Sequence, residues 1–172
     1  HWGATSQDII DTALMLRLRQ TLAIQEERLK YLLQSLAIKS RTYAKTPMAA
    51  RTYGQHATPT SWGAVLAQWG EPIADAMTAL PTLKNTSLLV SLSGSSGTAS
   101  VLGPDAPATR AALAEALKLA DPKRSLHTDR GPILRISNWM CDLVAALATM
   151  GQGLIGLTGS DTGEVSLGNV GE

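Results

Sequence analysis

The feature that most constrains the fold is an unusually long helical pattern near the start of the chain. From about Asp8 to Lys45, apolar side chains recur at three- and four-residue steps with charged side chains between them. The apolar positions are Ile10, Leu14, Leu18, Leu22, Leu29, Leu32, Leu33 and Leu36. A helix of this length exceeds the usual globular range of about 8 to 20 residues, so the pattern favours an extended helical bundle.

The stretch "GATSQD" immediately before this pattern has two interpretations. Thr5 and Asp8 form the [ST]-x-x-[DE] spacing that satisfies free backbone amides at a helix start. The same hydroxyls and amides could instead hold a carboxylate, since a helix start attracts anions. The residues alone favour the capping interpretation and leave the second one open.

A connection rich in turn formers follows the first helix. Thr46 and Pro47 break the helical pattern, and residues 48–63 are predicted to form a loop. A second helical run is predicted to begin around residue 60. Pro81 cannot donate its amide and should kink or end this second helix, which residues 83–92 can then resume.

Two further helices complete the predicted fold. Pro107 is well placed to open a helix that ends near Ala120, and a last long run covers about Gly131 to Leu157. No strand of five or more alternating residues emerges, so we predict an all-α fold, a bundle of long helices. These helices carry more apolar surface than one chain of this size can cover, which favours an oligomeric bundle.

Composition excludes several classes of function. A formal net charge of +1 gives no electrostatic signature of nucleic-acid binding or of attachment to an anionic membrane. No uninterrupted apolar run reaches the roughly 18 residues of a membrane span. The single cysteine, Cys141, excludes an internal disulfide, suits a reducing cytoplasm, and is expected to be a small buried hydrophobe. Since the chain has no initiator Met and ends in a glycine-rich stretch, we expect residues 1–172 to be one helical domain from inside a longer polypeptide.

Polar, glycine-containing clusters lie at the connections between helices, in residues 1–8, 51–60, 93–98 and 158–172. Unpaired amides at helix ends suit anionic ligands, and the Thr, Ser, Gln and His side chains found here suit a polycarboxylate. The alternative is that these clusters are ordinary caps and turns. The three histidines match no metal-ligand spacing, and "GQGLIG" at residues 151–156 follows a helical pattern rather than a strand. We therefore expect no metal and no nucleotide cofactor.

Three segments together resemble a known enzyme family. "HWGATSQDIIDTA", "RTYGQHATPTSWG" and "SLSGSSGTASVLG", in this order, are similar to motifs of the fumarase/aspartase superfamily. Within it they most resemble the bacterial 3-carboxy-cis,cis-muconate cycloisomerases, the lactonising enzymes of protocatechuate breakdown. The resemblance implies a homotetramer built on a central bundle of long helices, with each active site assembled from three subunits.

The resemblance also implies which residues form the site for a polycarboxylate substrate. The residues implied to bind it are His1, Thr5, Ser6, Asp8, Gln55, Thr58, Ser95, Ser96, Thr98, His127 and Arg130. Tyr53 stands where many superfamily lyases carry a general-acid histidine, although lactonising members tolerate another aromatic residue there. Because a phenol with a pKa of about 10 replaces an imidazole poorly, we take His56 as the catalytic, proton-handling residue.

The shared chemistry of the superfamily is proton transfer at the carbon next to a carboxylate, through an aci-carboxylate intermediate that hydroxyls and helix-end amides can stabilise. The base of the family is a serine near a Met-Pro-x-Lys sequence, expected just after Glu172, so we expect this chain alone to be inactive. Two alternatives stay open at this point. One is a carbon-nitrogen lyase resembling adenylosuccinate or argininosuccinate lyase, and the other is a helical oligomerisation module without catalysis.

Overall fold

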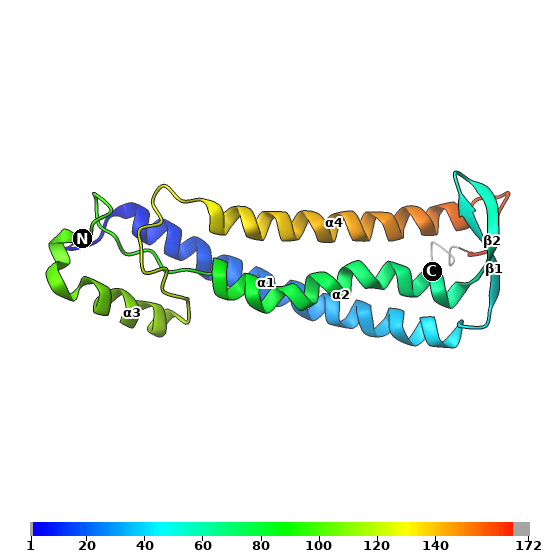
Figure 1. Ribbon diagram of the computed structural model, residues 1–172, viewed down its shortest axis with the longest axis horizontal. Helices are drawn as coiled ribbons and strands as arrows, with labels where there is room; N and C mark the ends of the chain where they lie inside the picture. Colours follow the sequence, from blue (N-terminus) through cyan, green and yellow to red (C-terminus); the bar gives the residue numbers. More distant parts are fainter. Residues whose placement is uncertain (1, 167–172) are drawn as a thin grey trace, which may run out of the picture. The chain divides into compact units, whose positions relative to one another are not determined.

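A computed structural model describes residues 2–166 of the chain. Its elements, labelled in Figure 1, are α1 (Ser6–Thr42), β1 (Pro47–Thr52), β2 (Gln55–Ser61), α2 (Trp62–Ser87), the 3-10 helix η1 (Ser100–Asp105), α3 (Ala106–Leu117) and α4 (Gly131–Leu157). Long helices dominate the described part of the chain, which confirms the predicted all-α bundle. His1, a predicted site residue, lies outside the described residues.

The chain divides into two compact units. The first consists of His1–Lys30 and Met77–Trp139, and the second of Tyr31–Ala76 and Met140–Glu172. Three helices, α1, α2 and α4, each contribute one segment to each unit. In the second unit α1 and α2 run antiparallel, with Gly63 against Ala44 and Gly70 against Leu33 (Figure 1).

The start of α1 forms by reciprocal capping. The Thr5 amide donates to Asp8 Oδ2 over 3.0 Å, and the Asp8 amide donates to the Thr5 carbonyl over 3.1 Å. These two bonds satisfy amides that the first turn of a helix otherwise leaves unpaired. The Asp8 half of the predicted capping pattern is therefore confirmed, whereas the Asp8 amide is satisfied by the Thr5 carbonyl rather than by its hydroxyl, and the helix begins at Ser6.

The buried face of α1 is narrower than its apolar pattern indicates. The buried apolar residues of this helix repeat at seven-residue steps: Met15, Leu22, Leu29 and Leu36. Ile10, which the pattern places on the same face, is 58% exposed. A seven-residue repeat is typical of helices packed as in a coiled coil, where one narrow seam faces the neighbouring helices. Among the remaining apolar side chains of the predicted face, Leu18, Leu32 and Leu33 are half-buried and Leu14 is exposed.

Of the two outcomes predicted for Pro81, a kink or an end of the second helix, the structure excludes the end. Helix α2 continues through Pro72 and Pro81 to Ser87. A proline inside a helix costs about 3 kcal/mol, but Leu80 and Leu83 on either side of Pro81 are buried. Their packing offsets the lost hydrogen bond. After Ser87 the chain does not resume a helix, because residues 88–93 run as a buried segment in which Leu89 forms a bridge with Ala120.

Residues 48–63, predicted to be a loop, contain an antiparallel β-hairpin. Strands β1 and β2 pair from Pro47↔Ser61 to Thr52↔Gln55, around a two-residue turn. Tyr53 and Gly54 in this turn have φ of +49° and +73°, the left-handed values that a tight hairpin turn requires. The strands escaped prediction because neither alternates apolar and polar residues, and β2 is largely exposed.

Several apolar groups of the second unit lie on its surface. Cys141, expected to be buried, is exposed, because it points away from the seam that Leu143 occupies on α4. Among the described helices, α4 is long and apolar enough to cross a membrane by length and composition, with a mean hydropathy of 1.5 over 18 residues and 17% of that window buried. An interface with other protein chains explains such a surface equally well.

Candidate functional site

The main polar cluster of the first unit is built around Asp8. Its carboxylate is 1% exposed. Oδ1 accepts hydrogen bonds from Ser91 Oγ at 2.9 Å, the Ser93 amide at 2.9 Å and His127 Nε2 at 2.8 Å. Oδ2 accepts from the Thr5 and Gly94 amides, each at 3.0 Å. One carboxylate therefore joins three segments that are far apart in the sequence.

The electrostatics of Asp8 reflect this arrangement. Burial raises the pKa of the Asp8 carboxyl, since desolvation penalises its charged form. The hydrogen bonds from the Thr5 amide, His127, Ser91 and the Gly94 amide outweigh burial and bring this pKa below its ordinary value of 3.8. Asp8 is therefore ionised at neutral pH and acts only as an acceptor.

A second carboxylate, one helical turn further along α1, holds the segment before α4. Asp11 Oδ1 accepts from Arg130 Nη1 and from Gln7 Nε2, both at 2.8 Å. Arg130 Nη2 also donates to the His127 carbonyl over 3.2 Å. Arg130 thus links α1 to the segment that carries His127, while 43% of its side chain stays exposed.

Exposed hydroxyls lie in the two segments that the buried Asp8 carboxylate joins. In the glycine-rich loop after Ser93, Ser95, Ser96 and Thr98 are exposed, and the Ser96 and Thr98 hydroxyls are 2.8 Å apart. Positive φ values of 71° at Gly94 and 77° at Gly97 let this loop turn sharply. Ser6 lies on the surface and Thr5 is half-buried at the start of α1. The geometry thus places exposed hydroxyls in segments whose backbone is fixed from beneath by Asp8.

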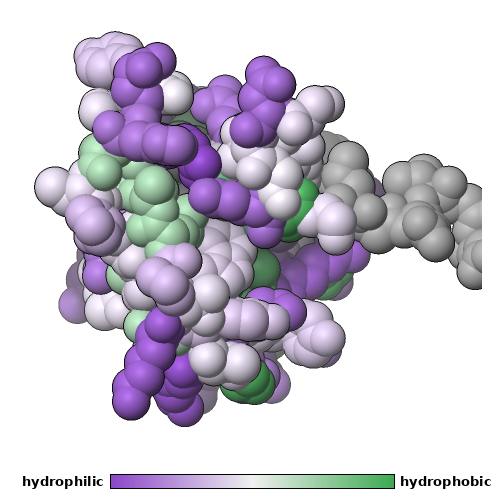
Figure 2. Space-filling view, turned by 90° about the vertical axis from the view of Figure 1, so that its right-hand side faces the viewer, coloured by the Kyte–Doolittle hydropathy of each residue, from purple (hydrophilic) through white to green (hydrophobic). Residues whose placement is uncertain are grey.

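The predicted site residues of the hairpin form a separate group in the second unit. Gln55, His56 and Thr58 all lie on β2 and are exposed. Next to this hairpin is a cleft of ≈ 650 Å³, lined among others by Thr58, Gln68 and Trp69. Viewed from the hairpin, the surface carries mostly hydrophilic and neutral side chains, with hydrophobic ones in small groups (Figure 2).

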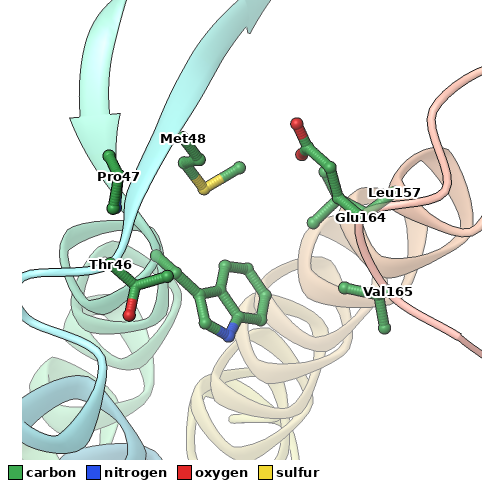
Figure 3. A pocket seen from close by; sticks show the side chains of 7 residues that line it. Thr46, Pro47, Met48, Leu157, Glu164 and Val165 are labelled. Carbon is green, nitrogen blue, oxygen red and sulfur yellow. The ribbon is translucent and has the colours of Figure 1, made fainter.

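The hairpin is tied to the segment after α4. Arg51 donates to both carboxylate oxygens of Glu164, at 2.8 and 3.0 Å. This bidentate pair lowers the pKa of Glu164 below its ordinary value and raises that of Arg51. A smaller cavity of ≈ 170 Å³ between Met48, Trp62 and Leu157 lies beside Glu164 (Figure 3). The charged pair therefore fixes how β1 meets the end of α4 within this unit.

The structure brings some of the predicted residues together and shows partners that sequence reasoning missed. Thr5, Asp8 and His127 meet directly, and Arg130 joins them through its contact with the His127 carbonyl. The missed partners are Asp11, Ser91, Ser93 and Gly94, together with Thr12, whose hydroxyl donates to the Ser91 carbonyl over 3.2 Å and accepts from the Ser91 amide over 3.0 Å. Two serines inside the apolar stretch "LLVSLSG" were the available signal, because buried serines need hydrogen-bond partners.

The described residues contain no group of three or more side chains suited to bind a metal ion.

Comparison with known proteins shows which family the chain belongs to. A family model described as Lyase matches residues 1–170. The chain belongs to this lyase family. It is 37% identical over 165 residues to the 3-carboxy-cis,cis-muconate cycloisomerase of Pseudomonas aeruginosa, covering 96% of this chain and 36% of that protein. It is 41% identical over 105 residues to the adenylosuccinate lyase of Archaeoglobus fulgidus, covering 61% of this chain and 24% of that protein.

A solved structure supports the same assignment. The 3-carboxy-cis,cis-muconate lactonizing enzyme from Pseudomonas putida superposes with a TM-score of 0.91 at 34% identity, covering 95% of this chain and 37% of that one. The resemblance to the fumarase/aspartase superfamily, and to its cycloisomerases in particular, is therefore confirmed. The chain spans about a third of the length of these cycloisomerase relatives.

Proposed function

We propose that the protein containing this chain lactonises 3-carboxy-cis,cis-muconate, a step of protocatechuate breakdown in the cytoplasm. A carboxylate of the substrate adds to a conjugated double bond, and the electron pair moves onto a neighbouring carboxylate as an aci-carboxylate. A proton then reaches the adjacent carbon. The observation that carries the proposal is the cluster around Asp8, which fixes two hydroxyl-bearing segments where the cycloisomerase motifs lie.

The proposed roles follow from exposure and chemistry. Thr5 and Ser6 at the start of α1 bind one substrate carboxylate, and Ser95, Ser96 and Thr98 bind another with their hydroxyls and backbone amides. Stabilisation is strongest in the aci-carboxylate, because that intermediate carries the most negative charge.

The hairpin supplies the other proposed contacts. Gln55 and Thr58 contact the substrate from β2, and His56 on the same strand delivers the proton.

We further propose that the site is completed by self-association to a homotetramer. The apolar side chains left exposed on the long helices include Ile9, Ile24, Ile38, Leu134, Val144 and Ile155. Large apolar side chains exposed along long helices suit an interface with other copies of the chain. Within such an assembly the hairpin of one copy contributes to the site of another, as the resemblance implies for this superfamily.

Assays on the polypeptide that contains residues 1–172 test the proposed reaction. We expect turnover of 3-carboxy-cis,cis-muconate and none of adenylosuccinate. The second candidate, a carbon-nitrogen lyase, is favoured by the 41% identity to an adenylosuccinate lyase, although that match covers less of the chain. Turnover of adenylosuccinate alone would establish this second candidate and exclude the first.

Two alanine variants separate an enzyme from a non-catalytic helical module. Ser6 and His56 are both exposed and make no side-chain hydrogen bond with another described residue. We therefore expect Ser6→Ala and His56→Ala to leave the fold intact and to reduce turnover, His56→Ala by about 100-fold or more. Unchanged turnover in both variants would contradict the roles assigned to them.

A further inference from the structure

The β-hairpin that carries His56 is only loosely packed against the helices of the second unit. Strand β2 is largely exposed. The cleft of ≈ 650 Å³ and the cavity of ≈ 170 Å³ are both lined by residues of the hairpin on one side and of α2 and α4 on the other. A two-stranded hairpin without a fully packed face is marginally stable in water. The position of this hairpin therefore depends on individual polar contacts.

The base of the hairpin is joined to the long helices through the backbone. The Trp62 amide donates to the Thr46 carbonyl over 2.9 Å, and the Gly63 amide donates to the Tyr43 carbonyl over 3.0 Å. Nearer the turn, and within the described part of the chain, Arg51 is the hairpin residue whose side chain forms hydrogen bonds outside the two strands. The end of the hairpin that lies far from the helices is thus held through this side chain.

The partner of Arg51 is itself fixed to the end of α4. The Glu164 amide donates to the Leu157 carbonyl over 3.1 Å, and the Gly163 amide donates to the Gly159 carbonyl over 2.8 Å, so the chain turns back onto the helix end. The Arg51 guanidinium then donates to both carboxylate oxygens of Glu164, at 2.8 and 3.0 Å. Two parallel bonds of this kind fix orientation as well as distance.

Arg51 lies directly opposite His56 in the hairpin. Side chains at opposed positions of antiparallel strands lie on the same face, with Cβ atoms about 4.5–5.5 Å apart. Hydrogen bonds from Arg51 lower the pKa of Glu164, and the charge of His56 lowers it further, in agreement with an imidazole close to this carboxylate. A continuous set of contacts therefore runs from the end of α4 through Glu164 and Arg51 to His56.

We propose that Arg51 and Glu164 are positioning residues, which hold the hairpin so that the His56 imidazole reaches the substrate in one orientation. The pair gives no proton to the substrate and forms no bond to it. The inference rests on the proposed function for the role of His56. It adds two residues that the family resemblance did not assign to the site.

Hydrogen exchange followed by mass spectrometry tests the link first, on the full polypeptide and without substrate. Glu164→Gln removes the charge and one of the two acceptor oxygens. Peptides that cover residues 47–61 should then exchange at least about tenfold faster, because local opening of the hairpin becomes easier. Arg51→Met should have the same effect. Unchanged exchange of these peptides in both variants would overturn the proposal.

Kinetics with 3-carboxy-cis,cis-muconate then test the positioning role. A misplacement of about 1 Å can cost about 100-fold in rate. The carboxylates of the substrate are bound in the proposed function mainly by hydroxyls of the first unit, which the pair does not touch. We therefore expect Glu164→Gln to lower kcat about tenfold or more and to change KM less than about threefold. Faster exchange of the hairpin together with an unaltered kcat would overturn the positioning role.

Further variants separate positioning from direct binding of the substrate by Arg51. Arg51→Met should reproduce the loss of kcat, and the double variant with Glu164→Gln should lose no more than either single one, since all three break the same contact. Arg51→Lys keeps the charge but not the two parallel bonds, so it should recover part of kcat. A rise of KM in Arg51→Met with normal kinetics in Glu164→Gln would show that Arg51 binds the substrate itself, and would overturn the positioning role.

Glu26→Gln is the matched control. Glu26 accepts a hydrogen bond from Lys30 over 2.7 Å and also pairs with Lys84, so this variant removes the same charge from an ion pair in the other unit. We expect no change in the exchange of residues 47–61 or in kcat. Effects equal to those of Glu164→Gln would indicate a general loss of stability and overturn the proposal.

This proposal and the proposed function fail in distinguishable ways. Absence of turnover with 3-carboxy-cis,cis-muconate, or turnover of adenylosuccinate alone, overturns the proposed reaction, and hydrogen exchange still judges whether the pair holds the hairpin. Normal turnover in the unsubstituted enzyme with an unaltered kcat in both Arg51→Met and Glu164→Gln overturns the positioning role while the proposed reaction stands.

Discussion

Replacing Asp8 by Ala should be among the most destabilising single changes in this chain. The carboxylate accepts five hydrogen bonds, two from the side chains of Ser91 and His127 and three from backbone amides. A buried donor left without a partner costs about 1–3 kcal/mol, and the removed charge returns part of its desolvation cost. Breaking a buried charged group out of its network typically costs about 3–5 kcal/mol, and we expect a loss in this range.

The loss is a large share of the total, because domains of this size are stable by only about 5–15 kcal/mol. It is measured by urea unfolding followed by circular dichroism, comparing midpoints at equal slopes. Asp142→Ala is the control, since Asp142 is exposed on α4, and its effect should stay within about 0.5 kcal/mol. A loss below about 1 kcal/mol for Asp8→Ala would refute the central place given to this carboxylate.

The effect of Asp8 should also depend on pH, with a sign that its pKa determines. The folded pKa lies below the ordinary 3.8, so the stabilisation is fully present above that value and is lost as pH falls through the folded pKa. The difference in unfolding free energy between the unsubstituted protein and Asp8→Asn should therefore shrink below about pH 4. A difference that stays constant down to pH 2 would contradict an ionised carboxylate.

Other predictions follow from close packing and from surface charge. Gly63→Ala should destabilise the fold by about 1–3 kcal/mol, measured in a thermal melt, because the added Cβ would lie 2.3 Å from the Ser40 carbonyl oxygen. Gly151→Ala is the control: its Cβ would have no atom within 4 Å, so this change should be neutral or stabilising. Hydrogen bonds from Lys30 and Lys84 lower the pKa of Glu26 from 4.5 to about 2. Glu26 therefore stabilises the folded protein above pH 4.5, and this contribution is lost as pH falls toward 2. The unfolding free energies of the unsubstituted protein and Glu26→Gln should differ by at most about 1 kcal/mol at neutral pH, and this difference should shrink in acid. A difference that widens at low pH would reverse the sign of this argument.

The parts of the fold that sequence predicted well are those governed by local rules. The limits of α4, Gly131 and Leu157, agree with the sequence-based ones, because glycine, proline and a long apolar period mark them without help from the rest of the fold. The start of α1 was equally local, since Thr5 and Asp8 cap it within one turn. The prediction that Pro81 could end the second helix failed for the opposite reason. A proline costs helix stability locally, but the burial of Leu80 and Leu83 outweighs that cost.

The β-hairpin and the candidate site also show that local sequence patterns cannot predict every part of the structure. Tyr53-Gly54 is an uncommon sequence for a two-residue turn, so its signal was weak, and β2 has no buried face to impose alternation. The family resemblance implied that Thr5, Asp8 and His127 belong to one site, and the structure places them in contact. The resemblance gave no indication that Asp8 contacts Ser91 and Ser93, which are 83 and 85 residues away. Contacts at such separations depend on the packing of the whole unit, which no local pattern encodes.

The placement of Asp8 gives a physical reason for the motif that contains it. In the proposed function, this loop binds a multiply charged anion through exposed hydroxyls and amides, and a flexible serine- and glycine-rich backbone would lose entropy on every binding event. Here the Ser93 and Gly94 amides are already fixed by a carboxylate beneath them. Part of that entropy is therefore lost on folding rather than on binding. The carboxylate that fixes the loop is 1% exposed and its charge is stabilised by five hydrogen-bond donors, so it does not lie on the surface that an incoming carboxylate would contact.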